Sequence, residues 1–489
     1  MIETLDAWVL EAGDALWTTA VLPVLAVLGV WFTLRSGVVQ LRLIPEMFRA
    51  LTDRTPKDAQ GKPQSLSAFQ AFTVSAASRV GVGNIAGVGT AIALGGPGAV
   101  FWMWLMGFVG GASAFVESTL GQLYKVRDAD GFHGGPAYYM QHGLTARWMG
   151  IVFAVILIIC FPFAFSSLQA NTIAATLDAA IGTDSGEGAG PVVWTVAVVL
   201  AALAGLVVFG GVRRIAHVTQ SVVPAMALLY LGVGIVIVAL NVERVPEVIG
   251  MIFTEAFGAQ QIFGGALGTV ILQGVKRGMF SNEAGLGSAP NAGATAAVTH
   301  PVKQGLVQTL GVYFDTFLVC SITAFIILVA TPDLSGATAG IGLTQAALTT
   351  SLGSWSSWLL AVIIFLLAFS SILGNYYYGE SNVEFISTSP AVLTGYRALV
   401  VAAVFVGAVL DSALIWDTAD GIMGLMALVN LVAIALLSGI AFRLLQDYTR
   451  QRRAGDDPVF TRDLMPDLDG VQCWEDEQSV TGQTPTVRG

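Results

Sequence analysis

The sequence predicts an all-α polytopic membrane protein with about 11 transmembrane helices. Two observations lead to this fold class. Hydrophobic residues make up 55% of the 489 residues and charged residues 11%, whereas soluble domains are roughly 45–50% apolar and about 25% charged. The mean hydropathy is +0.72, and the apolar residues gather in long runs without two-residue alternation, which disfavours a β-barrel. An ordinary soluble enzyme is therefore excluded.

Eleven runs are apolar enough for a membrane helix, which needs about 20 such residues. They cover residues 15–35, 66–94, 97–124, 149–180, 191–210, 215–240, 262–289, 304–330, 356–386, 393–410 and 421–445. A run at 341–352 is too polar to span, and we expect it on a surface. Residues 446–489 are charged and contain proline, so we expect a cytoplasmic tail with little structure.

Basic residues mark one set of alternate loops. Arg42 follows the first run, Arg213 and Arg214 follow the fifth, and the loops after the other odd-numbered runs are also basic. The remaining loops hold one base, Arg244. Because Lys and Arg favour the cytoplasmic side of a membrane, we predict an extracytoplasmic N-terminal segment (1–14) and a cytoplasmic C-terminus.

Several classes of function lack support in the sequence. The net charge of −10 argues against nucleic-acid binding. There is no Gly-Lys-Ser/Thr phosphate loop, so ATP-driven transport by this chain is unsupported. The four histidines and three cysteines lack metal-ligand spacing. A membrane-embedded enzyme would need His, Asp or Glu clustered at one membrane face, and the sequence indicates no such cluster, so we expect no enzyme.

Glycine interrupts two of the apolar runs. Gly81 and Gly83 lie in the centre of the second run, and a glycine-rich stretch around Gln273 and Gly274 lies in the seventh. Glycine costs about 1 kcal/mol relative to alanine inside a helix. Paired interruptions in two halves of a chain are typical of transporters, although close helix packing through small residues is an alternative explanation.

The spacing of the interruptions suggests an internal repeat of five helices. The two interrupted runs are five apart, so each would open one inverted half, and the first span would stand outside the repeat. An unwound stretch frees backbone amides that suit a carboxylate and carbonyls that suit a small cation. The predicted units are an extra first span and loop (15–65), a first repeat (66–240), a second repeat (241–445) and the tail (446–489).

Four blocks near these interruptions are distinctive. They read Gly81-Val-Gly-Asn-Ile-Ala-Gly87, Gly95-Gly-Pro-Gly-Ala-Val-Phe-Trp-Met-Trp104, Gly278-Met-Phe-Ser-Asn-Glu-Ala-Gly-Leu-Gly-Ser-Ala-Pro290 and Gly374-Asn-Tyr-Tyr-Tyr-Gly-Glu380. Over about residues 15–445 the chain resembles the sodium:alanine (alanine or glycine:cation) symporter family, within the amino acid–polyamine–organocation superfamily. Gly107 departs from that family's signature, which carries Ala, Ser, Thr or Val there, but it remains small.

The resemblance implies a leucine-transporter-like 5+5 inverted repeat with two broken helices. It also implies sodium-coupled uptake of a small neutral amino acid, alanine or glycine, by alternating access in the plasma (inner) membrane of a prokaryote. A proton-coupled symporter of the same fold is the main alternative. A membrane sensor or channel derived from the fold is less favoured, because we expect the tail to be too short for a signalling domain.

Substrate contacts are expected around both interruptions. The backbone amides of Val82, Gly83 and Asn84 are placed to bind a substrate carboxylate, and the Asn84 side chain can add a hydrogen bond. Gln169, in the fourth run, is proposed as a further contact, with a helix–helix hydrogen bond as its alternative role. The opposing interruption around Gln273 and Gly274 would face the substrate ammonium or close the pocket.

The sodium site follows by analogy with the wider fold that the resemblance implies. Carbonyls before the first interruption would meet two adjacent hydroxyls, and oxygen-only ligation suits Na⁺. The matching residues are Ala77, Val80, Ser370 and Ser371. The serines could instead bond back to their own helix. Asp315, in the eighth run, is the candidate for proton coupling, or a partner for Lys276 or Arg277. Substrate preference and oligomeric state stay open.

Overall fold

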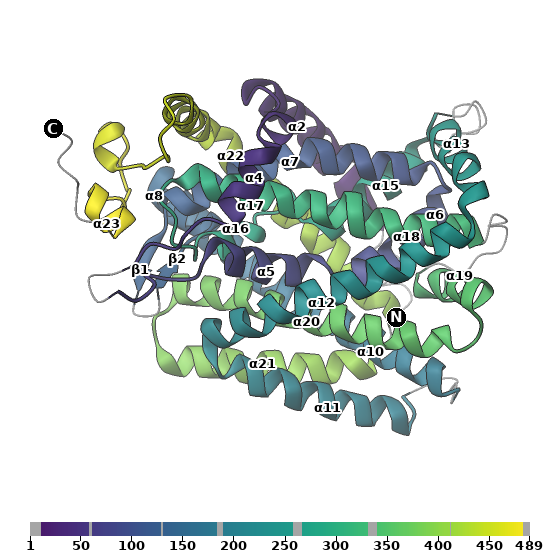
Figure 1. Ribbon diagram of the computed structural model, residues 1–489. Coiled ribbons are helices and arrows are strands. Elements are labelled where there is room, and N and C mark those ends of the chain that lie inside the picture. The colour runs from purple at the N-terminus through teal and green to yellow at the C-terminus, as the bar shows by residue number, and fades with distance from the viewer. Residues whose placement is uncertain are drawn as a thin grey trace.

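The computed structural model describes residues 11–57, 61–128, 131–182, 189–257, 267–330, 340–410 and 412–482. The described part is almost entirely helical, and its long helices run in one general direction (Figure 1). Among the described residues, nine helices are long and apolar enough to cross a membrane. Two further runs, the second and the seventh, are interrupted. The prediction of an all-α polytopic protein with two broken helices is confirmed.

The first half of the chain consists of the N-terminal span and the helices up to Leu240. The first spanning helix covers Glu11–Arg35. It contains η1 (Trp17–Val21) and α2 (Leu22–Arg35) and is followed by α3 (Val39–Arg42), α4 (Ile44–Leu51), α5 (Ala68–Arg79), η2 (Val82–Asn84), α6 (Ala86–Gly95), α7 (Ala99–Leu123), β1 (Val126–Asp128), β2 (Gly131–His133), α8 (Pro136–Gly143), α9 (Arg147–Ile158), η3 (Ile159–Phe165), α10 (Ser166–Ile181), α11 (Pro191–Val208) and α12 (Gly211–Leu240). Helix α2 packs on α7.

The second half begins with a short turn and ends with the tail. Its elements are η4 (Val242–Arg244), α13 (Val245–Ala256), α15 (Leu267–Asn282), α16 (Ala289–Gly293), α17 (Pro301–Tyr313), η5 (Phe314–Cys320), α18 (Ser321–Ala330), α19 (Ile341–Leu352), α20 (Ser356–Ile386), α21 (Pro390–Val409), α22 (Ser412–Arg453), η6 (Arg462–Leu464) and α23 (Glu477–Thr481). As expected, the run at 341–352 is a short helix that packs on α18 and α20 and does not span.

The helices form two packed groups. We call α5, α6, α7, α15 and α17 the bundle group, because α7 packs on α15 and α17, and α15 packs on α6. We call α10, α11, α20 and α21 the scaffold group, because α10 packs on α20 and α21, and α11 on α21. The scaffold group occupies the lower part of Figure 1 and α7, α15 and α17 the upper part. Helix α5 touches both groups through its contacts with α17 and α20.

Burial separates central helices from peripheral ones. In α7, 67% of the most apolar window is buried, whereas in α11 and α21 only 28% is. The outward side chains of α11, such as Val198 and Leu206, are apolar and exposed. A helix satisfies its own backbone hydrogen bonds and therefore tolerates lipid. The exposed apolar side chains of α11 make its outer surface suited to hydrocarbon rather than to water.

The β-hairpin lies at the same end of the molecule as the C-terminal tail (Figure 1), and we call this end the hairpin face. Val126 pairs with His133 across the antiparallel hairpin. The hairpin is attached to its surroundings, since Phe132 N donates to Ser65 Oγ at 3.3 Å. Next to it, Leu66 forms a β-bridge with Ala296. The loop between α7 and α8 is therefore fixed to the segments that flank the two interruptions.

The tail is more ordered than the sequence suggested. Helix α22 continues to Arg453, and the described residues beyond it pack on the hairpin face. Phe460 and Trp474 are buried. Trp474 Nε1 donates to Leu123 O at 3.1 Å, and Phe460 N donates to Thr299 O at 2.9 Å. The expectation of little structure is wrong because the side chains of Phe460 and Trp474 pack into apolar surroundings in the folded protein. The composition of the tail does not reveal these contacts.

Candidate functional site

The first interruption lies where it was predicted. Helix α5 starts with a capping box between Ser67 and Gln70 and ends at Arg79. The chain then leaves the helix, and Asn84 Oδ1 accepts from Gly81 N at 2.9 Å. A Cβ at Gly81 would lie 2.4 Å from Ser371 Oγ, so only glycine admits this approach. The interruption is thus a close meeting of α5 with the scaffold group.

Four of the predicted substrate residues, Val82, Gly83, Asn84 and Gln169, meet at this interruption. Val82 N donates to Gln169 Oε1 at 3.0 Å, which joins the break to α10. A Cβ at Gly83 would lie 2.8 Å from a ring carbon of Phe280, so Gly83 presents bare backbone to the second interrupted run. Asn84 Nδ2 donates to Asp315 Oδ1 at 2.6 Å. Gln169 therefore bonds to the break itself, and whether it also contacts substrate stays a prediction.

The second interruption lies later in the chain than predicted. Helix α15 continues through Gln273 and Gly274 as far as Asn282. A Cβ at Gly274 would lie 2.4 Å from the carbonyl oxygen of Ala99, so this glycine permits close packing of α15 on α7. Gln273 lies beside Gly95 at the far end of α6. The expected break at Gln273 and Gly274 is wrong, and whether either residue contacts substrate stays a prediction.

The actual second break follows Asn282 and is closed by a carboxylate. Glu283, Gly285 and Gly287 all have positive φ, of 57°, 85° and 82°. Glu117, from α7, accepts from Gly285 N at 3.2 Å and from Gly287 N at 3.1 Å. Asn430 Nδ2 also donates to Glu117, at 2.8 Å. The freed amides of this break are therefore satisfied by the protein.

A stack of aromatic rings lines the space beside Gly83. Phe280 stacks on Phe165 with ring centroids 4.5 Å apart, and Trp416 lies on the other side of Phe280 at 5.1 Å. Phe161 extends the stack from Phe165 at 4.8 Å. Phe161 and Phe165 belong to the same predicted fourth run as Gln169. Phe280 and Trp416 were missed, because no local pattern links them to the first break.

One of the two predicted hydroxyls reaches the end of α5. Ser371 Oγ lies 2.9 Å from Ala77 O and 2.7 Å from Ser78 O. Ser370 Oγ lies 2.9 Å from Leu367 O in its own helix and 3.3 Å from Met226 Sδ. Ser371 therefore belongs to an oxygen cluster with the carbonyls that precede the break, just before Val80. Ser370 follows the alternative that was considered for both serines.

Asp315 is buried within hydrogen bonds rather than paired with a base. Besides its bond to Asn84, its Oδ2 accepts from Ser281 Oγ at 2.8 Å and from Thr316 Oγ1 at 3.3 Å. Lys276 and Arg277 pair with Asp420 instead, each at 3.0 Å. The suggested ion pair of Asp315 with Lys276 or Arg277 is therefore wrong. Asp315 brings a carboxylate to the junction of both interrupted helices.

This fold and site define a secondary active transporter of the leucine-transporter type, with two interrupted helices meeting between a bundle and a scaffold. The same fold occurs in the crystal structure of MhsT in complex with L-phenylalanine, with a TM-score of 0.54 at 13% identity over 80% of this chain and 99% of that chain. The model of the sodium:alanine symporter family matches residues 2–462. The chain belongs to that family.

Named relatives agree with this assignment. The amino-acid carrier protein AlsT of Bacillus subtilis is 50% identical over 92% of this chain and 94% of its own length. The probable sodium/glutamine symporter GlnT of the same organism is 48% identical over 95% of both chains. The sodium/alanine symporter AgcS of Methanococcus maripaludis is 36% identical over 87% of this chain and 93% of its own. The protein is thus a multi-pass, cation-coupled amino-acid symporter and not an enzyme.

Proposed function

We propose that the protein couples Na⁺ entry to the uptake of a small neutral amino acid, alanine or glycine, by alternating access. The observation that carries the proposal is the oxygen cluster of Ser371 with the carbonyls of Ala77 and Ser78. A small hard cation favours such oxygens, and a cation there would neutralise the carbonyl ends of α5. Val80 and Ser370 are the remaining predicted ligands and would have to turn toward the ion.

The substrate carboxylate is assigned to the amides of the first break. Val82, Gly83 and Asn84 lie next to the cation cluster, so the ion and the carboxylate would attract each other across a short distance. Coupling follows, because the attraction between a bound cation and an adjacent carboxylate is strong in a low-dielectric site, so each ligand raises the affinity for the other. Gln169 supports the break from α10, and Gln273 and Gly274 lie too far along α15 to offer freed amides.

The aromatic stack supports a small substrate. Phe280 lies against Gly83 and is held between Phe165 and Trp416. A substrate with its carboxylate at the break would therefore present its side chain to rings that are already packed. A pocket can discriminate by about 1–3 kcal/mol per methylene when its walls are rigid, so we expect alanine and glycine to be preferred over larger amino acids.

Glutamine is a second candidate substrate. A relative that is 48% identical over 95% of the chain is named a probable sodium/glutamine symporter. A glutamine side chain needs polar partners that a methyl group does not. Uptake of glutamine in preference to alanine would show that the aromatic stack opens to admit it.

Proton coupling is the alternative for the ion. Asp315 is fully buried, receives hydrogen bonds from Asn84 and Ser281, and lies beside the proposed carboxylate site. One relative, from Bacillus sp., is named a sodium/proton-dependent alanine carrier and is 40% identical over 81% of this chain. A proton on Asp315 could replace or accompany the sodium ion.

Uptake into proteoliposomes tests both ligands. Labelled alanine, glycine and glutamine would be offered under an inward Na⁺ gradient, an equal K⁺ gradient and a pH gradient. We expect alanine or glycine to enter only with Na⁺. Uptake that follows the pH gradient alone would overturn the sodium assignment and direct attention to Asp315. Binding without flux would indicate a sensor, and no uptake of the three amino acids by folded protein would overturn the substrate assignment.

A further inference from the structure

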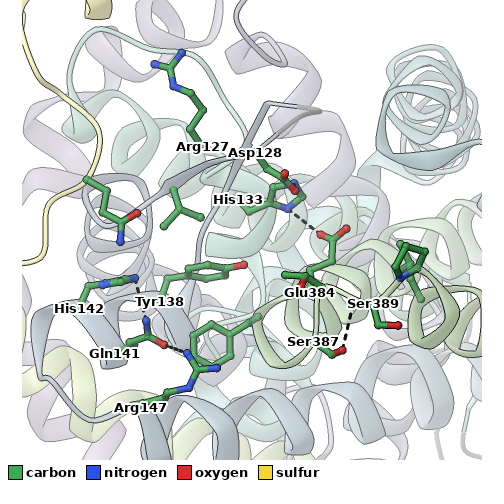
Figure 2. A pocket seen from close by; sticks show the side chains of 16 residues that line it. Arg127, Asp128, His133, Tyr138, Gln141, His142, Arg147, Glu384, Ser387 and Ser389 are labelled. Carbon is green, nitrogen blue, oxygen red and sulfur yellow. Dashed lines mark hydrogen bonds and ion pairs between the residues drawn. The ribbon is translucent and has the colours of Figure 1, made fainter.

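A second polar cluster lies on the hairpin face, away from the transport site. It joins Asp128 of β1, His133 of β2 and Glu384 near the end of α20 (Figure 2). One potential ligand atom from each residue lies within 4.8 Å of the others. The sequence suggested no such cluster at a membrane face, because Glu384 comes from the other half of the chain and has no spacing relation to the hairpin.

The distances within the cluster suit a metal ion. His133 Nε2 lies 3.6 Å from Asp128 Oδ2, which is longer than a hydrogen bond. Two ligands of a tetrahedral zinc ion with bonds of about 2.1 Å are separated by about 3.4 Å. His133 Nδ1 lies 3.1 Å from Glu384 Oε2. A metal-bound imidazole commonly places its other ring nitrogen against a carboxylate, which fixes the ring for the ion.

The histidine of the cluster is almost fully buried, whereas the two carboxylates are partly exposed to solvent. The His133 side chain is 9% exposed, that of Glu384 24% and that of Asp128 56%. The cluster lines a cavity of about 550 Å³ that is open to the hairpin face (Figure 2). An ion can therefore enter from the aqueous side and meet an imidazole that is already oriented.

Two arginines that line the same cavity contact other groups. Arg147 donates to Gln141 Oε1 at 2.6 Å and lies 5.3 Å from the Phe385 ring. Arg127 lies 5.3 Å from the Phe132 ring. In Figure 2 Arg127 points away from the cluster. The cluster itself brings two carboxylates and one imidazole together, a donor set that suits a divalent cation.

We propose that Asp128, His133 and Glu384 form a binding site for a divalent transition-metal ion of the zinc class. One imidazole nitrogen and carboxylate oxygens form a donor set that zinc accepts, with water completing the coordination. His133 Nε2 and Asp128 bind the ion directly, and Glu384 holds the ring through His133 Nδ1. The site lies between the hairpin and α20.

The ion would strengthen a contact between parts of the molecule that have to move apart. The hairpin is tied through Ser65 to the segment before α5, in the bundle group. Glu384 belongs to α20, in the scaffold group. An ion on Nε2 keeps the proton of His133 on Nδ1, where it is donated to Glu384, and this strengthened contact would restrain the movement of one group against the other. This consequence, inhibition of transport from the hairpin side, rests on the proposed alternating access, whereas binding itself does not.

Zinc titration of the purified full-length protein tests the binding. Chelator-treated protein in nanodiscs would be titrated with Zn²⁺ by isothermal calorimetry. We expect one site, lost in His133→Ala and weakened about 10–100-fold in Asp128→Asn and Glu384→Gln. His142→Ala is the matched control, because His142 lines the same cavity outside the cluster. Zinc affinity unchanged in His133→Ala, or no zinc binding by the wild type, would overturn the site.

Transport provides a second readout. Zn²⁺ on the hairpin side of proteoliposomes should slow uptake by the wild type and by His142→Ala. Glu384→Gln, whose monodisperse elution would show that it is folded, should keep its uptake in zinc. Zinc binding by the wild type with unaltered uptake would overturn the restraint between the two groups while leaving the metal site. Failure of all amino-acid uptake without zinc would instead count against the proposed function.

Discussion

Two adjacent serines in α20, Ser370 and Ser371, have different hydrogen-bond partners. Ser371 Oγ reaches the carbonyls of Ala77 and Ser78, whereas Ser370 Oγ reaches Leu367 O in its own helix. Adjacent side chains on a helix point about 100° apart. Both could be proposed as ligands from the sequence, but their directions depend on how α20 packs against α5.

The Ser371→Ala variant should need more Na⁺ for half-maximal uptake. Removing a hydroxyl that binds a charged group costs about 1.5–3 kcal/mol, which corresponds to roughly 10–100-fold in the Na⁺ concentration required. Ser370→Ala is the matched control and should change this concentration less. The measurement is labelled alanine uptake as a function of Na⁺. Equal Na⁺ dependence in wild type and Ser371→Ala would remove Ser371 from the ion site.

The Asn84→Ala variant should bind substrate more weakly. Its side chain holds Gly81 N at 2.9 Å and Asp315 Oδ1 at 2.6 Å, so its loss loosens the break on two sides. We expect an increase of about 10-fold in the alanine concentration for half-maximal uptake. Asn241→Ala, in a loop outside the site, is the control. A variant with wild-type affinity would show that the Asn84 side chain does not organise the substrate amides.

At the scale of elements, the two breaks show why one could be predicted and the other could not. Gly81 and Gly83 mark the first break directly, because both permit close contacts there. In the seventh run, Gly274 serves helix packing against Ala99, and the glycines that end the helix come later. Glycine has both uses, and the sequence does not distinguish them. The acceptor that closes the second break, Glu117, comes from another helix.

Removing that acceptor should destabilise the protein. Glu117→Ala leaves the buried amides of Gly285, Gly287 and Asn430 without their partner. Each unsatisfied buried group costs about 1–3 kcal/mol, so we expect a clearly lower melting temperature in detergent. Glu117→Gln keeps one acceptor oxygen and should lie between. Glu247→Ala, an exposed acid on α13, serves as the control. A melting temperature for Glu117→Ala that matches the control would contradict the assigned role.

His300, which caps the N-terminus of α17, should make the stability of the fold depend on pH. His300 Nδ1 accepts from Val302 N at 3.2 Å, which requires a neutral Nδ1. Burial lowers the pKa of His300 below its ordinary value of 6.5, although Asp447 opposes the shift. Above about pH 6.5 the ring is neutral in both the folded and the unfolded state, so protonation of His300 does not lower the free energy of unfolding. Below about pH 6.5 the unfolded state binds the proton more readily than the folded state, so the free energy of unfolding falls.

Thermal unfolding at several pH values checks this. The melting temperature of the wild type should fall as the pH drops below about 6.5, and more steeply than that of His300→Asn. Asparagine keeps an N-cap acceptor but does not titrate. Parallel pH profiles for the two proteins would show that another group is responsible.

At the scale of the whole molecule, hydropathy and charge predict the class of fold well. Within the part of the chain that the structure describes, nine spans and two interrupted runs follow from long apolar runs, which a bilayer requires. Pairings between distant helices could not be predicted. Asp420 binds both Lys276 and Arg277, and Trp474 packs against Leu123, although neither pair is related by any spacing. Those contacts depend on three-dimensional packing, which periodicity does not encode.

Orientation in the membrane is a property of the whole chain that can be measured. The distribution of Lys and Arg predicts that the hairpin face is cytoplasmic. In a cysteine-free background, Glu243→Cys should react with a membrane-impermeant maleimide added to intact cells. Thr388→Cys, on the hairpin face beside the cavity, should react only after the cells are opened. The reverse pattern would invert the topology and place the proposed metal site outside the cell.

The contact between Ser371 and Ala77 also bears on how the protein is made. It joins residues 294 positions apart, so α5 and its unwound end leave the ribosome long before α20 exists. Until then the free backbone groups of the break lack their scaffold partners, and exposing them to lipid would cost several kcal/mol each. Insertion must therefore keep the nascent first repeat beside the translocon, or in contact with an insertase, until late in synthesis. Truncated chains that end before α20 should be substrates for membrane proteolysis.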